Sequence, residues 1–137
     1  MSVPARLRSI TDFKLLNDSK DFLAYLCRIN VEPKILPKKH KVPLGDKMIT
    51  LMEDFIELVS SGNRIHVNYK SDYRRRREFQ DKASAKLDLL LCIAIVLDTT
   101  TKLHDATRNV LFNYIYSIGD TLTGWIVSDE NRYARLK

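Results

Sequence analysis

The side chains of this 137-residue sequence that could do chemistry are mostly cations, and they are concentrated in the middle of the chain. Residues 34–86 hold 13 Lys and Arg against 7 Asp and Glu, a net +6, whereas the rest of the chain holds 10 of each sign. A local basic block is the electrostatic footprint of a polyanion partner. The alternative is a solvated surface that keeps the protein soluble; we favour a nucleic-acid partner.

Two basic segments carry this charge. The first, "LPKKHKVPLGDKM" (36–48), holds four basic side chains between two prolines, ahead of a hydrophobic helix. The second includes "YRRRREFQDK" (73–82), where four successive arginines sweep nearly a full helical turn, so some must project outward. Tyr69 and Tyr73 are interleaved as stacking surfaces for unpaired bases. The predicted nucleic-acid-binding residues are Lys38, Lys39, His40, Lys41, Arg64, Lys70, Arg74, Arg75, Arg76, Arg77, Lys82 and Lys86.

The alternative for the second segment is a charged helix end. In that interpretation Asp72, Glu78 and Asp81 neutralise the arginines. Even a binding surface of this kind implies contacts with phosphates and no reading of base sequence.

Sequence motifs for catalysis are missing. No P-loop, GxGxxG, HExxH or GxSxG pattern is present. His40, His66 and His104 are scattered and have no metal-ligand spacing. We therefore predict no metal, no other cofactor and no catalytic residue.

One near match to a ribonuclease motif needs attention. Small α-helical ribonucleases of the HEPN class carry an Arg, a polar residue, four further residues and a His. In "RNVLFNY", Arg108 and Asn109 fit this pattern, but Tyr114 stands where the His would be. Without an imidazole the usual acid–base chemistry fails. We predict that Tyr114 is a core aromatic, and keep a HEPN-like ribonuclease or toxin as the alternative function.

The apolar periodicity predicts an all-α fold, a single domain over residues 1–137. Apolar side chains recur at steps of three and four, the pattern of amphipathic helices. Short connections between four such helices predict an antiparallel up-down bundle. The expected helices span residues 10–31, 43–66, 72–98 and 101–127, followed by a polar, frayed tail over 128–137. Ser71 or Asp72 is expected to cap the third helix, and Thr100 or Thr101 the fourth.

Nine consecutive apolar residues, Leu89 to Leu97, lie in the third expected helix. A helix that is apolar all round must be covered on every side, and the simplest cover is another subunit. A buried β-strand is the competing interpretation of the run. The predicted oligomer interface consists of Leu89, Cys92, Ile93 and Val96.

Other features predict a cytoplasmic protein with no membrane partner. The N-terminus has no apolar signal core, and no apolar run is long enough to span a bilayer. Cys27 and Cys92 lie in apolar stretches and are expected to be buried free thiols.

The order of these segments resembles a known family. Pro37, Lys38, Lys41, Leu44, Gly45 and Asp46 match a Pro-Lys…Leu-Gly-Asp helix start, and Ile118, Gly119, Leu122, Gly124, Trp125 and Ile126 match a closing Ile-Gly…Leu-Gly-Gly-Trp-Ile segment. On these motifs the chain, over residues 13–127, resembles Avd, the accessory variability determinant family of diversity-generating retroelements.

The resemblance implies a four-helix bundle that assembles as a barrel-like homopentamer with a positively charged surface. It also implies a non-catalytic accessory protein that binds the element's reverse transcriptase and its template RNA, with cDNA as a further candidate ligand, in support of mutagenic cDNA synthesis. A related bundle family, encoded in intervening sequences of ribosomal RNA genes, is the nearest alternative. Trp125 favours Avd.

The chain departs from the family pattern at two places. The family places basic residues late in the third helix, where this chain has Cys92 and Ile95, and its own arginines lie earlier, at 74–77. The closing segment also reads Thr-Gly-Trp in place of Gly-Gly-Trp.

Overall fold

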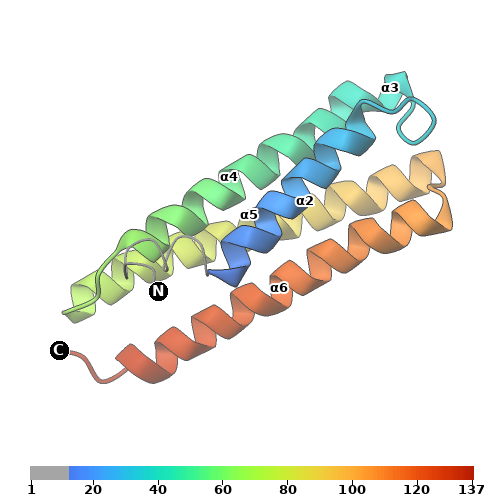
Figure 1. The fold of residues 1–137 in the computed structure, drawn as a ribbon. Coiled ribbons are helices and arrows are strands. Elements are labelled where there is room, and N and C mark those ends of the chain that lie inside the picture. The colour runs from blue at the N-terminus through green and yellow to red at the C-terminus, as the bar shows by residue number, and fades with distance from the viewer. Residues whose placement is uncertain (1–12) are drawn as a thin grey trace, which may run out of the picture.

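The computed structural model describes residues 13–137, and this part of the chain is all-helical, with no strand. Four long helices pack together lengthwise (Figure 1). The prediction of an all-α bundle is confirmed, and residues 89–97 are helical, so the strand alternative is wrong. The elements in order are α2 (Lys14–Asn30), α3 (Lys38–His40), the π-helical turn η1 (Lys41–Gly45), α4 (Asp46–Arg64), α5 (Lys70–Thr101) and α6 (Asp105–Tyr133).

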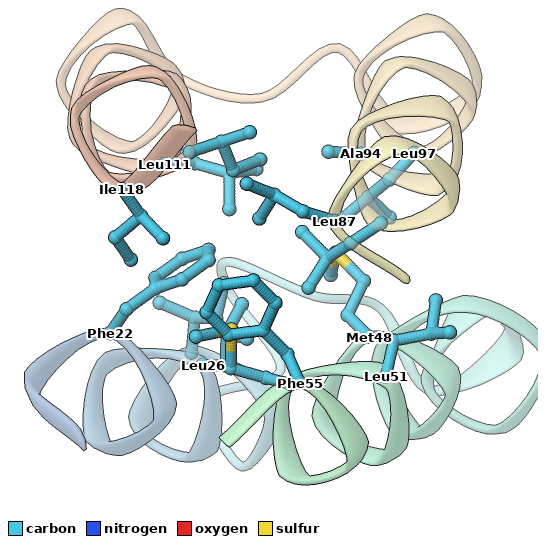
Figure 2. Packing of buried hydrophobic residues seen from close by; sticks show 14 of the residues in the cluster. Phe22, Leu26, Met48, Leu51, Phe55, Leu87, Ala94, Leu97, Leu111 and Ile118 are labelled. Carbon is cyan, nitrogen blue, oxygen red and sulfur yellow. The ribbon is translucent and has the colours of Figure 1, made fainter. Parts of the chain in front are cut away.

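A single hydrophobic core fills the space between the four long helices. Each helix contributes a stripe of side chains at steps of three and four, because those positions share one face. Figure 2 shows these stripes meeting at the centre, with Phe22 of α2 and Phe55 of α4 pointing toward the leucines of α5 and α6. Both phenylalanines are fully buried, so the aromatic rings lie at the middle of the core.

The turn between α2 and α4 is held by a close approach of backbone to side chain. Asn30, the last residue of α2, donates a hydrogen bond of 2.8 Å to the Asp46 carboxylate in the first turn of α4. Gly45 makes this approach possible, since a Cβ there would lie 2.0 Å from Asn30 Oδ1 and 2.5 Å from Leu36 Cδ2. The corner is thus fixed by packing as well as by Pro37 and Pro43.

Several helix boundaries differ from those expected. α5 begins at Lys70, two residues early, with Tyr69 as the N-cap residue. Ser71 is therefore not the cap, whereas Asp72 lies at N3 and its carboxylate accepts a hydrogen bond from the Tyr69 N–H. Thr100 and Thr101 belong to the last turn of α5, where their hydroxyls donate to carbonyls one turn back, and α6 begins only at Asp105. Because these hydroxyls form hydrogen bonds with carbonyls of α5, they do not cap α6.

The prediction that residues 128–137 form a frayed tail is wrong for residues 128–133, which are helical. α6 continues to Tyr133. The reason is Asp129, which is buried and pairs with Arg76 of α5. Asp129 lies in a polar stretch of the sequence, but its carboxylate is part of the packed interior.

The outward face of α5 remains apolar and open to solvent. Leu89, Ile95 and Val96 are 43–48% exposed, and Cys92 is exposed as well. Ile93 is half-buried. The expectation of buried thiols is wrong for Cys92 and also for Cys27, which is exposed on α2. Within residues 13–137, no helix combines the length and apolarity needed to cross a bilayer.

Gly45→Ala should destabilise the fold by about 1–3 kcal/mol, because both buried neighbours of the new methyl group must shift. Gly124→Ala is the matched control. Its added Cβ would meet nothing within 4 Å, so it should stabilise α6 by about 0.5–1 kcal/mol. Denaturant unfolding of both variants measures the difference, and equal stabilities would show that the Gly45 contact is unimportant.

Candidate nucleic-acid interface

The first basic segment forms a compact corner at one end of α4. Lys38 and Lys39 are exposed, and His40 and Lys41 are half-buried. We call these four residues the corner cluster. Because α3 and η1 run directly into α4, the cluster is held by regular backbone rather than by an extended loop.

The second basic segment begins at the opposite end of the same helix. α4 has 19 residues, so it separates the corner cluster from Arg64 by about 28 Å at 1.5 Å per residue. Figure 1 shows α3 at one end of the bundle and the connection between α4 and α5 at the other. The two basic segments therefore begin at opposite ends of the bundle in a single chain.

The arginine run divides into two outward and two engaged side chains. Arg74 and Arg75 are exposed and form no ion pair within the described residues. Arg77 lies between Asp81 and Glu130. Its guanidinium donates hydrogen bonds to both carboxylates, and these bonds raise the pKa of Arg77 above the ordinary arginine value. Two of the four predicted phosphate contacts, Arg76 and Arg77, are thus already occupied by carboxylates.

Arg76 and Asp129 form the most buried ion pair among the described residues. Its guanidinium donates to both carboxylate oxygens of Asp129, at 2.7 and 3.0 Å, and its side chain is 12% exposed. Gln80 donates a further bond of 2.7 Å to the same carboxylate. The guanidinium carbon also lies 5.2 Å from the centre of the Trp125 ring, a cation–π distance. Arg76 is therefore a structural residue, and its predicted role in binding is not supported by its position.

The remaining cations on α5 are spread along the helix. Lys82 is exposed, whereas Lys86 lies 3.3 Å from Asp54 of α4. Near the start of the helix, Arg64 is exposed and Lys70 half-buried. The exposed arginines of α5, Arg74 and Arg75, therefore lie near its N-terminal end.

The start of α5 is fixed by Asp72. Its carboxylate accepts hydrogen bonds from the backbone N–H groups of Asn68 (3.1 Å) and Tyr69 (3.0 Å), and these bonds lower its pKa. A lowered pKa means that this contact stabilises the fold above the ordinary carboxyl range. The contribution is lost as the pH falls through the lowered value.

Three further cations come to the same end from the C-terminal segment, and the sequence interpretation missed them. The backbone N–H of Lys70 donates to the carbonyl of Lys137 (3.2 Å), and the rings of Tyr73 and Tyr133 lie 5.7 Å apart. Figure 1 shows the C-terminus beside the connection between α4 and α5. The exposed or half-buried cations gathered here, which we call the bundle-end cluster, are Arg64, Lys70, Arg74, Arg75, Arg132, Arg135 and Lys137.

The charge of this end equals that of the whole chain. Residues 64–77 and 129–137 together hold nine Lys and Arg against three Asp and Glu, a net +6. Two of the three acids, Asp129 and Glu130, are paired with Arg76 and Arg77. The signal that could have identified the C-terminal part is the charge of "NRYARLK", read together with the aromatic Tyr133.

The residues of the near match to a ribonuclease motif have structural partners. Arg108 pairs with Asp98 at 3.1 Å and with Asp105 at 2.8 Å, which raises its pKa. The Tyr114 ring stacks on buried Phe22, with centroids 5.1 Å apart. Tyr114 is thus a core aromatic, as predicted from the sequence.

Two grooves lie on the surface of the described residues, each between a pair of helices. A groove of about 380 Å³ lies between α2 and α6, and one of about 200 Å³ between α5 and α6. Neither is lined by a histidine or cysteine of the described residues. Residues 13–137 also contain no group of three His, Cys, Asp or Glu side chains that could hold a metal ion.

No protein-family model, curated protein or solved structure matches the sequence.

Asp129→Asn should destabilise the protein by about 3 kcal/mol, because it leaves the Arg76 guanidinium largely buried without its counter-charge. Asp120→Asn, on the exposed side of the same helix, should change stability by less than about 0.5 kcal/mol. Chemical denaturation of both variants tests this difference. A similar small effect for the two would mean that the buried pair contributes little.

Proposed function

We propose that this protein is a non-catalytic accessory protein of a diversity-generating retroelement, of the Avd type, that binds the element's reverse transcriptase and its template RNA. One observation carries the RNA part of the proposal. Seven cations from three segments of the chain gather at one end of the bundle, and none forms an ion pair among the described residues. Unpaired, exposed cations are the groups that displace counterions from phosphates.

The motif residues behind the resemblance have definite structural roles, which supports the same proposal. Gly45 allows α2 and η1 to approach, and Asp46 receives the hydrogen bond from Asn30. Trp125 packs beside the Arg76 guanidinium at the bundle end. Such residues define a fold, so a shared pattern of them favours a shared architecture.

We further propose that the bundle is antiparallel, up-down, and that copies assemble as a barrel-like homopentamer through the outward face of α5. The support is a set of exposed apolar side chains on this face. Leu89, Cys92, Ile95 and Val96 are exposed on α5, and the stacked rings of Phe112 and Tyr116 lie on neighbouring α6. Exposed apolar patches of this kind mark protein interfaces.

A small ribonuclease or toxin is the competing function. The structural partners of Arg108 and Tyr114 argue against it, since neither side chain is free to act on a phosphodiester. Incubation of RNA with the purified protein separates the two functions. A binder leaves the RNA intact, whereas cleavage at the rate expected of an enzyme would refute the accessory role.

Arg74→Gln combined with Arg75→Gln should weaken RNA binding and lower the slope of log affinity against log salt by about 1.4, or roughly 0.7 for each lost contact to single-stranded RNA. Lys38→Gln combined with Lys39→Gln removes the same charge at the corner cluster, and it should have a smaller effect. Fluorescence anisotropy over a salt series measures both. Equal losses would show that net charge, and not the bundle end, determines binding.

Leu89→Glu combined with Val96→Glu should convert the assembly to single chains, because two carboxylates would be buried without partners at the interface. Ala24→Glu, on the exposed side of α2, adds a carboxylate away from this face and should leave the assembly intact. Light scattering of each variant gives the molar mass. A wild-type protein that is monomeric at micromolar concentration would contradict the assembly.

A further inference from the structure

The most exposed large aromatic residue of the bundle end is Tyr69, which is 68% exposed. Its backbone is nevertheless fixed. Its N–H donates to the Asp72 carboxylate, and its carbonyl accepts from the N–H groups of Asp72 (3.0 Å) and Tyr73 (3.2 Å). The ring is therefore presented to solvent from a rigid helix start, so a ligand that stacks on it orders little additional backbone.

The other tyrosines nearby are committed to packing. Tyr73 and Tyr133 pack against each other, and the Tyr133 ring also lies 5.9 Å from the Arg76 guanidinium carbon. These contacts join the start of α5 to the end of α6. They leave Tyr69 as the ring that is free to receive a ligand, with the bundle-end cluster on the elements around it.

We infer that the bundle end is a site for unpaired RNA, in which a base stacks on the Tyr69 ring while the bundle-end cluster binds the adjoining phosphates. This inference rests on the proposed function and names the class of RNA that the site takes. An aromatic side chain stacks only on a base whose face is open, and duplex RNA covers both faces of its internal bases. Every base has such a face, so the site tolerates any sequence.

The C-terminal segment is part of this site. Arg132 and Arg135 are exposed, and the hydrogen bond from the Lys70 N–H to the Lys137 carbonyl holds the segment beside the start of α5. The segment therefore adds phosphate contacts beside the tyrosine. Binding of a single strand should depend on Arg132 and Arg135 as well as on Arg74 and Arg75.

The test compares an unstructured, fluorescently labelled oligouridylate with an RNA duplex of the same length, bound to the full chain. Tyr69→Leu should weaken binding of the single strand by about tenfold, in the range of stacking on one aromatic ring, and leave duplex binding unchanged. Tyr69→Phe keeps the ring and should bind as the wild type does. Arg132→Gln combined with Arg135→Gln should lower the salt slope for the single strand by about 1.4.

The outcomes separate the two proposals. Wild-type affinity for the single strand in Tyr69→Leu, with the fold confirmed by its thermal unfolding, would overturn the stacking site while RNA binding stands. Equal loss for both RNAs, or loss in Tyr69→Phe as well, would overturn it too, since a ring face would not be the cause. A wild-type protein that binds neither RNA would refute the proposed function itself.

Discussion

The buried ion pair between Arg76 and Asp129 determines how one end of this bundle is built. It joins two helices at positions 53 residues apart in sequence, and it is shielded by Trp125 and Gln80. Breaking such a pair leaves an uncompensated charge in the protein interior, where the dielectric constant is low. The pair therefore fixes the register between the start of α5 and the end of α6, and with it the place of every charged side chain nearby.

That register explains why the four arginines have different roles. Successive helical residues turn by about 100 degrees, so Arg76 and Arg77 meet the acidic turn of α6 while Arg74 and Arg75 face solvent. The same contact carries α6 past Asp129 to Tyr133. Arg132 and Arg135 then lie beside the start of α5, where a frayed tail would have scattered them.

The fold was largely predictable from the sequence, whereas the candidate site was only half predictable. Steps of three and four between apolar residues identify each long helix, because burying one stripe requires that period. Local patterns also identified the core position of Tyr114. They could not pair Arg76 with Asp129, since no local rule links residues so far apart. Because this pairing could not be predicted, residues 128–137 were expected to be a frayed tail. For the same reason Arg76 and Arg77, which are paired with carboxylates, were expected to bind phosphates.

The two basic clusters of one chain are separated by the length of α4, so a single short ligand cannot bind both. A polyanion gains more from many weak contacts than from one when the sites are held close together, because each later contact forms at high effective concentration. Assembly through the apolar face of α5 would supply that closeness by placing the bundle ends of neighbouring chains beside one another. In the proposed assembly the exposed Leu89 and Val96 would join the subunits, and the joined basic ends would bind RNA more tightly than one end alone.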